Sequence, residues 1–148
     1  MERALAVVDA EESTKALVRE AGELAAAVDA ELVLLHVTTN DEYEEMRQTM
    51  EEIPNSAVGY SAQKARDGAE EFAADIGREV LEGIDVSWEA VGELGDEQTE
   101  ILEAAAGRDC DHLFIAGEKR SPTGKALFGD LTQSIILNFA GPVTVVTE

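Results

Sequence analysis

The sequence predicts a single α/β domain, a doubly wound, parallel five-stranded sheet with helices on both faces. Two observations predict this fold class. Five short apolar segments alternate with segments of helical periodicity along the 148 residues, and no repeat, linker or low-complexity tract interrupts them. The composition is 45% hydrophobic but only 5% aromatic, which favours one aliphatic core. A chain of this length can bury such a core without disulfides or a structural metal, so residues 1–148 are expected to form one domain.

The first two apolar segments predict strands that are buried on both faces. Residues 3–9 (RALAVVD) and 31–37 (ELVLLHV) are nearly continuous apolar runs, the pattern of strands inside a parallel sheet. Between them, Ser13 is the expected N-cap of a helix that runs to about Asp29, because apolar residues recur there at helical spacing. His36 lies within the second run with no evident nucleophile or carboxylate partner nearby, so a core role is expected for it.

The middle of the chain is its least regular part. Residues 38–60 contain breakers and turn formers, which favour a short helix within a long connection. Residues 61–81 predict a long amphipathic helix that ends near Gly83. Residues 84–91 alternate between apolar and polar side chains, which predicts a half-exposed edge strand. Trp88, on the apolar face of this strand, is expected to pack in the core rather than to stack on a ligand.

The last third of the chain completes the alternation. Residues 95–107 predict a helix bounded by glycines, and residues 111–116 (DHLFIA) predict a fourth strand. Residues 131–139 predict a helix that a Gly-Pro pair stops, and residues 143–147 (VTVVT) predict a fifth strand. Because helical segments separate all of the strands, these are expected to run parallel with right-handed crossovers.

The charge of the chain excludes nucleic-acid binding. There are 32 acidic and 11 basic residues, a formal net charge of −21, whereas contacts to a phosphate backbone need cationic side chains. The acidic residues are spread over every polar segment rather than gathered in one tail. Molar salt screens such self-repulsion, since the Debye length falls to about 3 Å at ~1 M, so we interpret the composition as adaptation to high salt.

The cysteine content and the first ten residues indicate where in the cell the protein is expected to be. The single Cys110 excludes an internal disulfide and a clustered zinc site, and it is expected to be a buried or half-buried thiol. The apolar run in residues 1–10 is too short for a signal peptide or a membrane span. A cytoplasmic location without membrane contact is therefore expected.

Residues 117–130 (GEKRSPTGKALFGD) lie between a predicted strand and a predicted helix. Glycine at the strand exit and at the helix entry allows close approach of backbone to a ligand, and a helix N-terminus points N–H groups at an anion. The segment also contains three of the basic residues, Lys119, Arg120 and Lys125. These features predict a phosphate-binding turn. A solvated loop whose glycines are ordinary turn residues is the alternative.

Asp9 is the second candidate for ligand contact. In an open parallel sheet, ligands bind beyond the carboxyl ends of the strands, where the strand order reverses. Asp9 follows the first strand, Val37 closes the second and Gly117 closes the fourth. If the first and fourth strands are neighbours, Asp9 faces the glycine loop and accepts hydrogen bonds from a ribose or a base. A helix cap or a salt bridge is the open alternative for Asp9.

The chain resembles the universal stress protein family over essentially its full length. The matching segments are Val7-Val8-Asp9, Leu34-Leu35-His36-Val37, Ile115-Ala116-Gly117, the glycine loop and Gly141-Pro142-Val143-Thr144-Val145-Val146. The resemblance implies a Rossmann-like sheet of the adenine nucleotide alpha hydrolase type, with strand order 3-2-1-4-5. It also implies a homodimer made by pairing the last strands, through Val143, Thr144, Val145 and Val146. A short apolar strand at a sheet edge favours such pairing independently.

ATP-binding members of that family are similar in carrying Gly, two residues, Gly, nine residues, then Gly and Ser or Thr. Here Gly117 and Gly129 take the outer positions, Arg120 replaces the second glycine, the later spacer is one residue shorter and Asp130 replaces the hydroxyl residue. Asp130 is expected to be the helix N-cap, where its carboxylate would occupy the N–H groups that a phosphate uses and would repel the anion. The resemblance implies a nucleotide-binding set of Val8, Asp9, Val37, Ala116, Gly117, Arg120, Gly129, Asp130, Leu131 and Thr132, with Lys119 and Lys125 as phosphate-neutralising candidates.

Two functions follow as expectations. The first is a stress-response or regulatory protein that binds an adenine nucleotide, ATP or AMP, with Mg²⁺ if the ligand is a triphosphate. The second is a dimeric scaffold or chaperone-like protein that binds no nucleotide and acts on an unidentified regulatory protein partner. No pair of nucleophile and base is evident, so no catalytic residue and no metal site is predicted, and turnover would be at most weak ATP hydrolysis.

Overall fold

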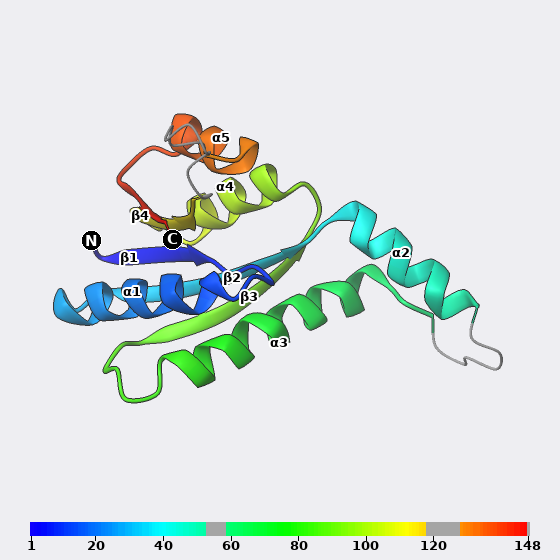
Figure 1. Ribbon diagram of the computed structural model, residues 1–148, viewed down its shortest axis with the longest axis horizontal. Coiled ribbons are helices and arrows are strands. Elements are labelled where there is room, and N and C mark those ends of the chain that lie inside the picture. Colours follow the sequence, from blue (N-terminus) through cyan, green and yellow to red (C-terminus); the bar gives the residue numbers. More distant parts are fainter. Residues whose placement is uncertain (53–58, 118–127, 148) are drawn as a thin grey trace.

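The computed structural model describes residues 1–52, 59–117 and 128–147. They form one five-stranded sheet that lies between two layers of helices (Figure 1). The elements follow one another as β1 (Arg3–Val7), α1 (Ser13–Ala27), β2 (Glu31–Thr38), α2 (Asn40–Glu51), α3 (Ala62–Val80), β3 (Trp88–Leu94), α4 (Glu97–Gly107), β4 (His112–Ala116), α5 (Asp130–Asn138) and β5 (Val143–Val146).

All of the strand pairs are parallel, and the order is β3-β2-β1-β4-β5, which confirms the predicted fold class and strand order. The central strand β1 pairs with β2 and with β4, so that Leu5 lies opposite Val33 on one side and Leu113 on the other. The prediction that β3 is an edge strand is also confirmed. β5 forms the other edge.

Alternate residues of each central strand are buried on opposite faces of the sheet. Ala4 and Ala6 of β1 pack with residues of α1 and α3, whereas Leu5 and Val7 pack with residues of α4 and α5. Figure 1 shows α1 and α3 on one face of the sheet and α4 and α5 on the other. This two-sided burial explains why β1 and β2 are continuous apolar runs in the sequence. Among the described residues, no helix is both long and apolar enough to cross a membrane.

The edge strand β3 begins at Trp88, four residues later than the alternation at 84–91 predicts. The N–H of Ile84 donates to the carbonyl of Leu81 in the turn that follows α3, so the first part of this segment is not in the sheet. Ile84, Val86 and Trp88 still pack against the core beneath α1 and α3. The alternation therefore predicted correctly which side chains are buried, but not the residue at which strand pairing begins. Core packing of Trp88 is confirmed.

Helix α2 lies in the connection between β2 and α3, as the predicted short helix does. It stands away from the sheet (Figure 1), and none of its residues is buried. A capping box begins it, in which the Thr39 side chain accepts from the N–H of Glu42 and the Glu42 side chain reaches back to the Thr39 N–H. Local interactions rather than core packing therefore stabilise this helix.

The thiol of Cys110 is half-buried, as expected. Desolvation raises the pKa of this thiol from its ordinary value of 9.0 to about 11, and the cations of Arg3 and Arg108 only partly oppose the shift. Cys110 is therefore protonated and poorly reactive at neutral pH.

Gly92 of β3 allows a close approach between the sheet and α3. A Cβ placed on Gly92 would overlap the backbone carbonyl of Arg66 and the backbone N–H of Glu70, both in α3. Backbone atoms of a packed helix cannot move aside as a flexible side chain can. The sequence therefore needs glycine here for packing, not for a turn.

We expect Gly92→Ala to lower the free energy of unfolding by about 2 kcal/mol, because the added methyl overpacks the contact between β3 and α3. The matched control is Gly68→Ala in α3, where an added Cβ meets nothing within 4 Å. It should raise the free energy of unfolding by about 0.5–1 kcal/mol, since alanine favours helix. Urea unfolding of both variants measures the difference. Equal effects would show that the Gly92 contact does not determine packing.

Candidate functional site

The strand order reverses at the carboxyl ends of β1 and β4. From β1 the chain crosses to β2 on one side, while β4 and β5 extend the sheet on the other side. Such a reversal leaves a hollow beyond the strand ends that helices do not fill. The structure has a cavity of about 430 Å³ at this place, which we call the crevice. The described residues that line it are Val7, Asp9, Glu11, Ser13, Glu97, Ile115, Ala116, Gly117, Gly129, Asp130, Leu131 and Thr132.

The adjacency of β1 and β4 brings Asp9 and the ends of the glycine loop together, as the sequence predicts on that condition. Of the predicted nucleotide-binding set, Asp9, Ala116, Gly117, Gly129, Asp130, Leu131 and Thr132 line the crevice. Lys119, Arg120 and Lys125 lie outside the described residues. Their predicted role in neutralising phosphate stays a prediction.

Asp9 has a defined structural role in the turn between β1 and α1. Its Oδ1 accepts a hydrogen bond from the backbone N–H of Glu11 at 2.9 Å, and its own N–H donates to Oγ1 of the buried Thr14 at 3.0 Å. The N-cap of α1 is Glu12, not Ser13, and no side chain caps this helix. Asp9 therefore fixes the turn rather than capping the helix, and its half-buried carboxylate lies in the wall of the crevice.

Thr132, which also lines the crevice, joins α5 to the end of β4. Its buried Oγ1 donates to the carbonyl of Ala116 at 2.8 Å. The N–H of Gly117 donates to the carbonyl of Val146 in β5 at 2.9 Å. A Cβ on Gly117 would lie 2.7 Å from Cγ1 of Val145, so packing against β5 is sufficient reason for glycine at this position.

Asp130 is not the N-cap of α5, and that prediction is wrong. Gly129 is the N-cap in extended conformation, and Asp130 is the first helical residue. Within the part of the chain that the structure describes, no side chain makes a capping hydrogen bond here. The backbone N–H groups of the first turn are thus not occupied by the Asp130 carboxylate, although its negative charge stays at the helix start. The helix begins one residue earlier than expected because Gly129 readily takes the extended N-cap conformation.

Val8 and Val37 do not line the described walls of the crevice. Val8 is 1% exposed and packs beneath α1 and α3, while its neighbour Val7 lines the crevice. Val37 is buried in the core beneath α4 and α5. The carbonyl of Val8 pairs with Nδ1 of His36 at 2.7 Å, and the His36 ring contacts that of Phe72 at 4.5 Å between centroids. His36 is therefore a hydrogen-bonded, half-buried core residue, as expected.

Glu97, which the sequence analysis missed, is the first residue of α4 and lines the crevice from that helix. Desolvation raises the pKa of its carboxyl, and the nearby carboxylates of Glu42, Asp9 and Asp96 raise it further, while His36 lowers it. A second hollow of about 450 Å³ shares Glu97, Asp130 and Leu131 with the crevice and continues toward the end of β2. Glu97 thus lies where the two hollows meet.

The charged side chains in the described walls of the crevice all carry carboxylates. They are those of Asp9, Glu11, Glu97 and Asp130. No lysine or arginine is among the described lining residues. Among the described residues, the geometry thus offers hydrogen-bond acceptors after β1 and the backbone N–H groups of the first turn of α5, together with several carboxylates.

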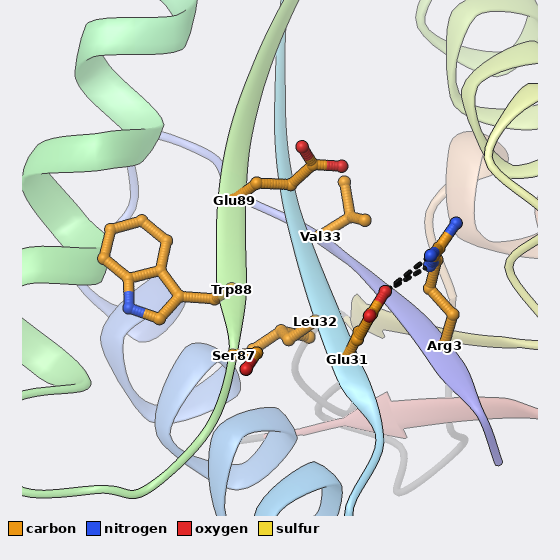
Figure 2. A pocket seen from close by; sticks show the side chains of 7 residues that line it. All are labelled: Arg3, Glu31, Leu32, Val33, Ser87, Trp88 and Glu89. Atoms are coloured by element: carbon orange, nitrogen blue, oxygen red, sulfur yellow. Dashed lines mark hydrogen bonds and ion pairs between the residues drawn. The ribbon is translucent and has the colours of Figure 1, made fainter.

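Another cavity, of about 250 Å³, lies at the amino-terminal side of β2 and β3 (Figure 2). Arg3, the cation among the described residues that line it, is already paired, because its Nε donates to Glu31 at 2.8 Å and its Nη1 donates to the carbonyl of Arg108 at 2.7 Å. Figure 2 shows the Arg3 and Glu31 side chains directed toward each other. The position of this cavity, away from the carboxyl ends of the strands, makes the crevice the better candidate site.

The fold and the crevice define a doubly wound α/β domain with a ligand-type hollow at its switch point. The chain belongs to the universal stress protein family, whose sequence model matches residues 1–147. A comparison with curated proteins found no match.

Solved structures share the fold at low sequence identity. Universal stress protein UspA from Lactobacillus plantarum is 17% identical, with a TM-score of 0.70 and coverage of 98% of this chain and 97% of that one. A universal stress protein in complex with cAMP is 16% identical, with a TM-score of 0.66 and coverage of 99% and 96%. A family protein from Arabidopsis thaliana with AMP bound is 16% identical, with a TM-score of 0.60 and coverage of 100% and 92%.

The hydrogen bond from the Thr132 hydroxyl to the Ala116 carbonyl should stabilise the wall of the crevice. We expect Thr132→Val to lower the free energy of unfolding by about 1 kcal/mol, because it leaves the half-buried carbonyl of Ala116 without this donor. The control is Thr49→Val in exposed α2, where Thr49 donates to the carbonyl of Glu45 at 2.9 Å. Water can replace that bond, so the change should stay within about 0.5 kcal/mol. Chemical denaturation of the two variants tests the contrast, and equal losses would contradict it.

Proposed function

We propose that this universal stress protein binds an adenine nucleotide in the crevice as part of a stress-response or regulatory role. The observation that carries the proposal is that Asp9 and the first turn of α5, whose N-cap residue Gly129 has no capping side chain, line the same cavity. A carboxylate accepts hydrogen bonds from ribose hydroxyls, and a helix N-terminus binds phosphate. The complexes of two family proteins with cAMP and AMP support this ligand class.

The residues divide between the ends of such a ligand. Asp9 is proposed to hold the ribose or base, with Val7 and Ile115 as the apolar floor. The backbone from Gly129 to Thr132 is proposed to hold phosphate, aided by Lys119, Arg120 and Lys125 of the glycine loop. If the ligand is ATP, Mg²⁺ would come with it, and the exposed carboxylate of Asp130 has the oxygen ligands that this ion prefers.

The acidic composition belongs to the same proposal as an adaptation to high salt. The formal net charge of −21 is distributed over a chain of only 148 residues. Each ion pair between described residues involves exposed or half-exposed side chains. Such pairs offset little repulsion, so added salt should stabilise the folded state by screening.

To test nucleotide binding, calorimetric titrations with ATP, ADP and AMP, with and without Mg²⁺, would be carried out in multimolar KCl. We expect saturable binding of at least one nucleotide, and at least tenfold weaker binding by Ser13→Leu, because the larger side chain fills the crevice from the start of α1. Ser13 makes no capping hydrogen bond, so the helix should tolerate the change.

The matched control for this titration is Ala16→Leu, an exposed position one turn along α1, which should bind as the parent protein does. If no nucleotide binds to the parent protein, the proposal is wrong. If Ser13→Leu binds normally, the ligand lies elsewhere.

We also propose that the protein forms a homodimer through β5. The alternative function, a scaffold or chaperone-like protein that acts on a regulatory partner, depends on this dimer. β5 is an edge strand, and its four residues are only half-buried. The carbonyls of Pro142 and Val146 accept hydrogen bonds from Leu113 and Gly117, so these alternate positions face β4. The N–H and C=O groups of Val143 and Val145 then point to the open edge, where a second β5 could pair.

Val145→Pro should convert the dimer to a monomer, because it removes an edge N–H while the hydrogen bonds from Leu113 and Gly117 to β5 are kept. Val145→Thr keeps the N–H and the β-branched shape and should remain dimeric. Light scattering after size exclusion measures mass, and circular dichroism checks that both variants are folded. A folded Val145→Pro dimer, or a monomeric parent protein, would contradict pairing through β5.

A further inference from the structure

The crevice combines a proposed place for phosphate with several carboxylates among its described lining residues. Glu97 approaches it from α4, Asp130 from α5 and Asp9 from the turn after β1. These side chains come from three separate parts of the chain. The topology of the sheet, not a local acidic run in the sequence, therefore concentrates carboxylates in this one hollow.

Glu97 is a partly desolvated carboxylate with like-charged neighbours. Its side chain is half-buried, and the pKa of its carboxyl is raised first by desolvation and then by Glu42, Asp9 and Asp96. His36 opposes this rise in the pKa of Glu97. A carboxylate that already lacks full solvation and has like-charged neighbours interacts more strongly with an incoming anion than one in open water.

The position of Glu97 also matters, because it lies where the crevice meets the neighbouring hollow toward the end of β2. Asp130 lies in the wall of both hollows as well. Of the described carboxylates, that of Asp130 belongs to the first turn of α5, where a single phosphate would bind. A longer polyphosphate chain that extends along the crevice adds further negative charges between Asp130 and Glu97.

We propose that this crevice selects its nucleotide by charge and takes an adenosine monophosphate, linear or cyclic, in preference to ATP. Glu97 and Asp130 are the residues that determine this specificity. The inference rests on the proposed nucleotide function. A pair of unit charges 4 Å apart lowers affinity about fivefold even at the dielectric constant of water, so the added phosphates of ATP are strongly disfavoured.

The test compares the affinities for AMP and ATP, measured by calorimetry with a chelator present so that no divalent ion neutralises the triphosphate. In the lowest KCl concentration at which the protein stays folded, AMP should bind at least tenfold more tightly than ATP. The preference for AMP over ATP should become smaller in multimolar KCl, because the Debye length falls to about 3 Å at ~1 M salt.

Glu97→Gln and Asp130→Asn each remove one charge with little change of shape. Each should improve ATP binding about fivefold relative to AMP binding at the lower salt concentration. Glu103→Gln is the control, since Glu103 is exposed on α4 and is not among the described residues that line the crevice. It makes the same change in net charge and should leave the ratio unaltered.

The outcomes separate the two claims. Equal affinity of the parent protein for AMP and ATP, or the same change of ratio in Glu103→Gln as in Glu97→Gln, would overturn charge selection while leaving nucleotide binding in place. A complete absence of nucleotide binding would overturn both. A salt-dependent preference for AMP that Glu97→Gln and Asp130→Asn weaken, and Glu103→Gln does not, would support the proposal.

Discussion

The structure depends on the pairing of β1 with β2 on one side and with β4 on the other. Leu5 at the middle of β1 has strand neighbours in both directions and helices over both faces, so no part of it reaches solvent. Because β2 lies on one side of β1 and β4 on the other, the strand order reverses at this point. The hollow at its carboxyl end is a direct consequence of that reversal. The candidate site is therefore a product of the same constraint that determines the core.

The sequence predicted the fold well because burial on two faces leaves a strong signal. Continuous apolar runs mark the central strands, and helical spacing marks the covering helices. It predicted the crevice less well, because the residues that face a cavity are selected by details of the backbone. Val7 and not Val8 lines the wall, since successive strand residues point to opposite faces. Glu97 has no local motif, and only the position of α4 beside the switch point brings it to the site.

The glycines show how a motif and its physical cause can differ. Gly92 is required by the backbone of α3, and Gly117 lies against Val145 of β5, so each has a packing explanation that involves no ligand. Glycine spacing in the loop is thus weak support for phosphate binding in this chain. Stronger support comes from Gly129, whose extended conformation begins α5 without a side-chain cap. The N–H groups of that first turn are the ones that an anion can use.

The negative walls of the crevice also determine how salt should act on binding. Proteins that hold phosphate with cationic side chains usually lose affinity as salt rises, because ions screen the attraction. In this crevice the described charges are those of Asp9, Glu11, Glu97 and Asp130, so at these residues salt screens repulsion instead. The same screening reduces repulsion across a chain of net charge −21. If the proposed function holds, ionic strength should favour stability and anion binding together, which would link the composition of the whole chain to the chemistry of one site.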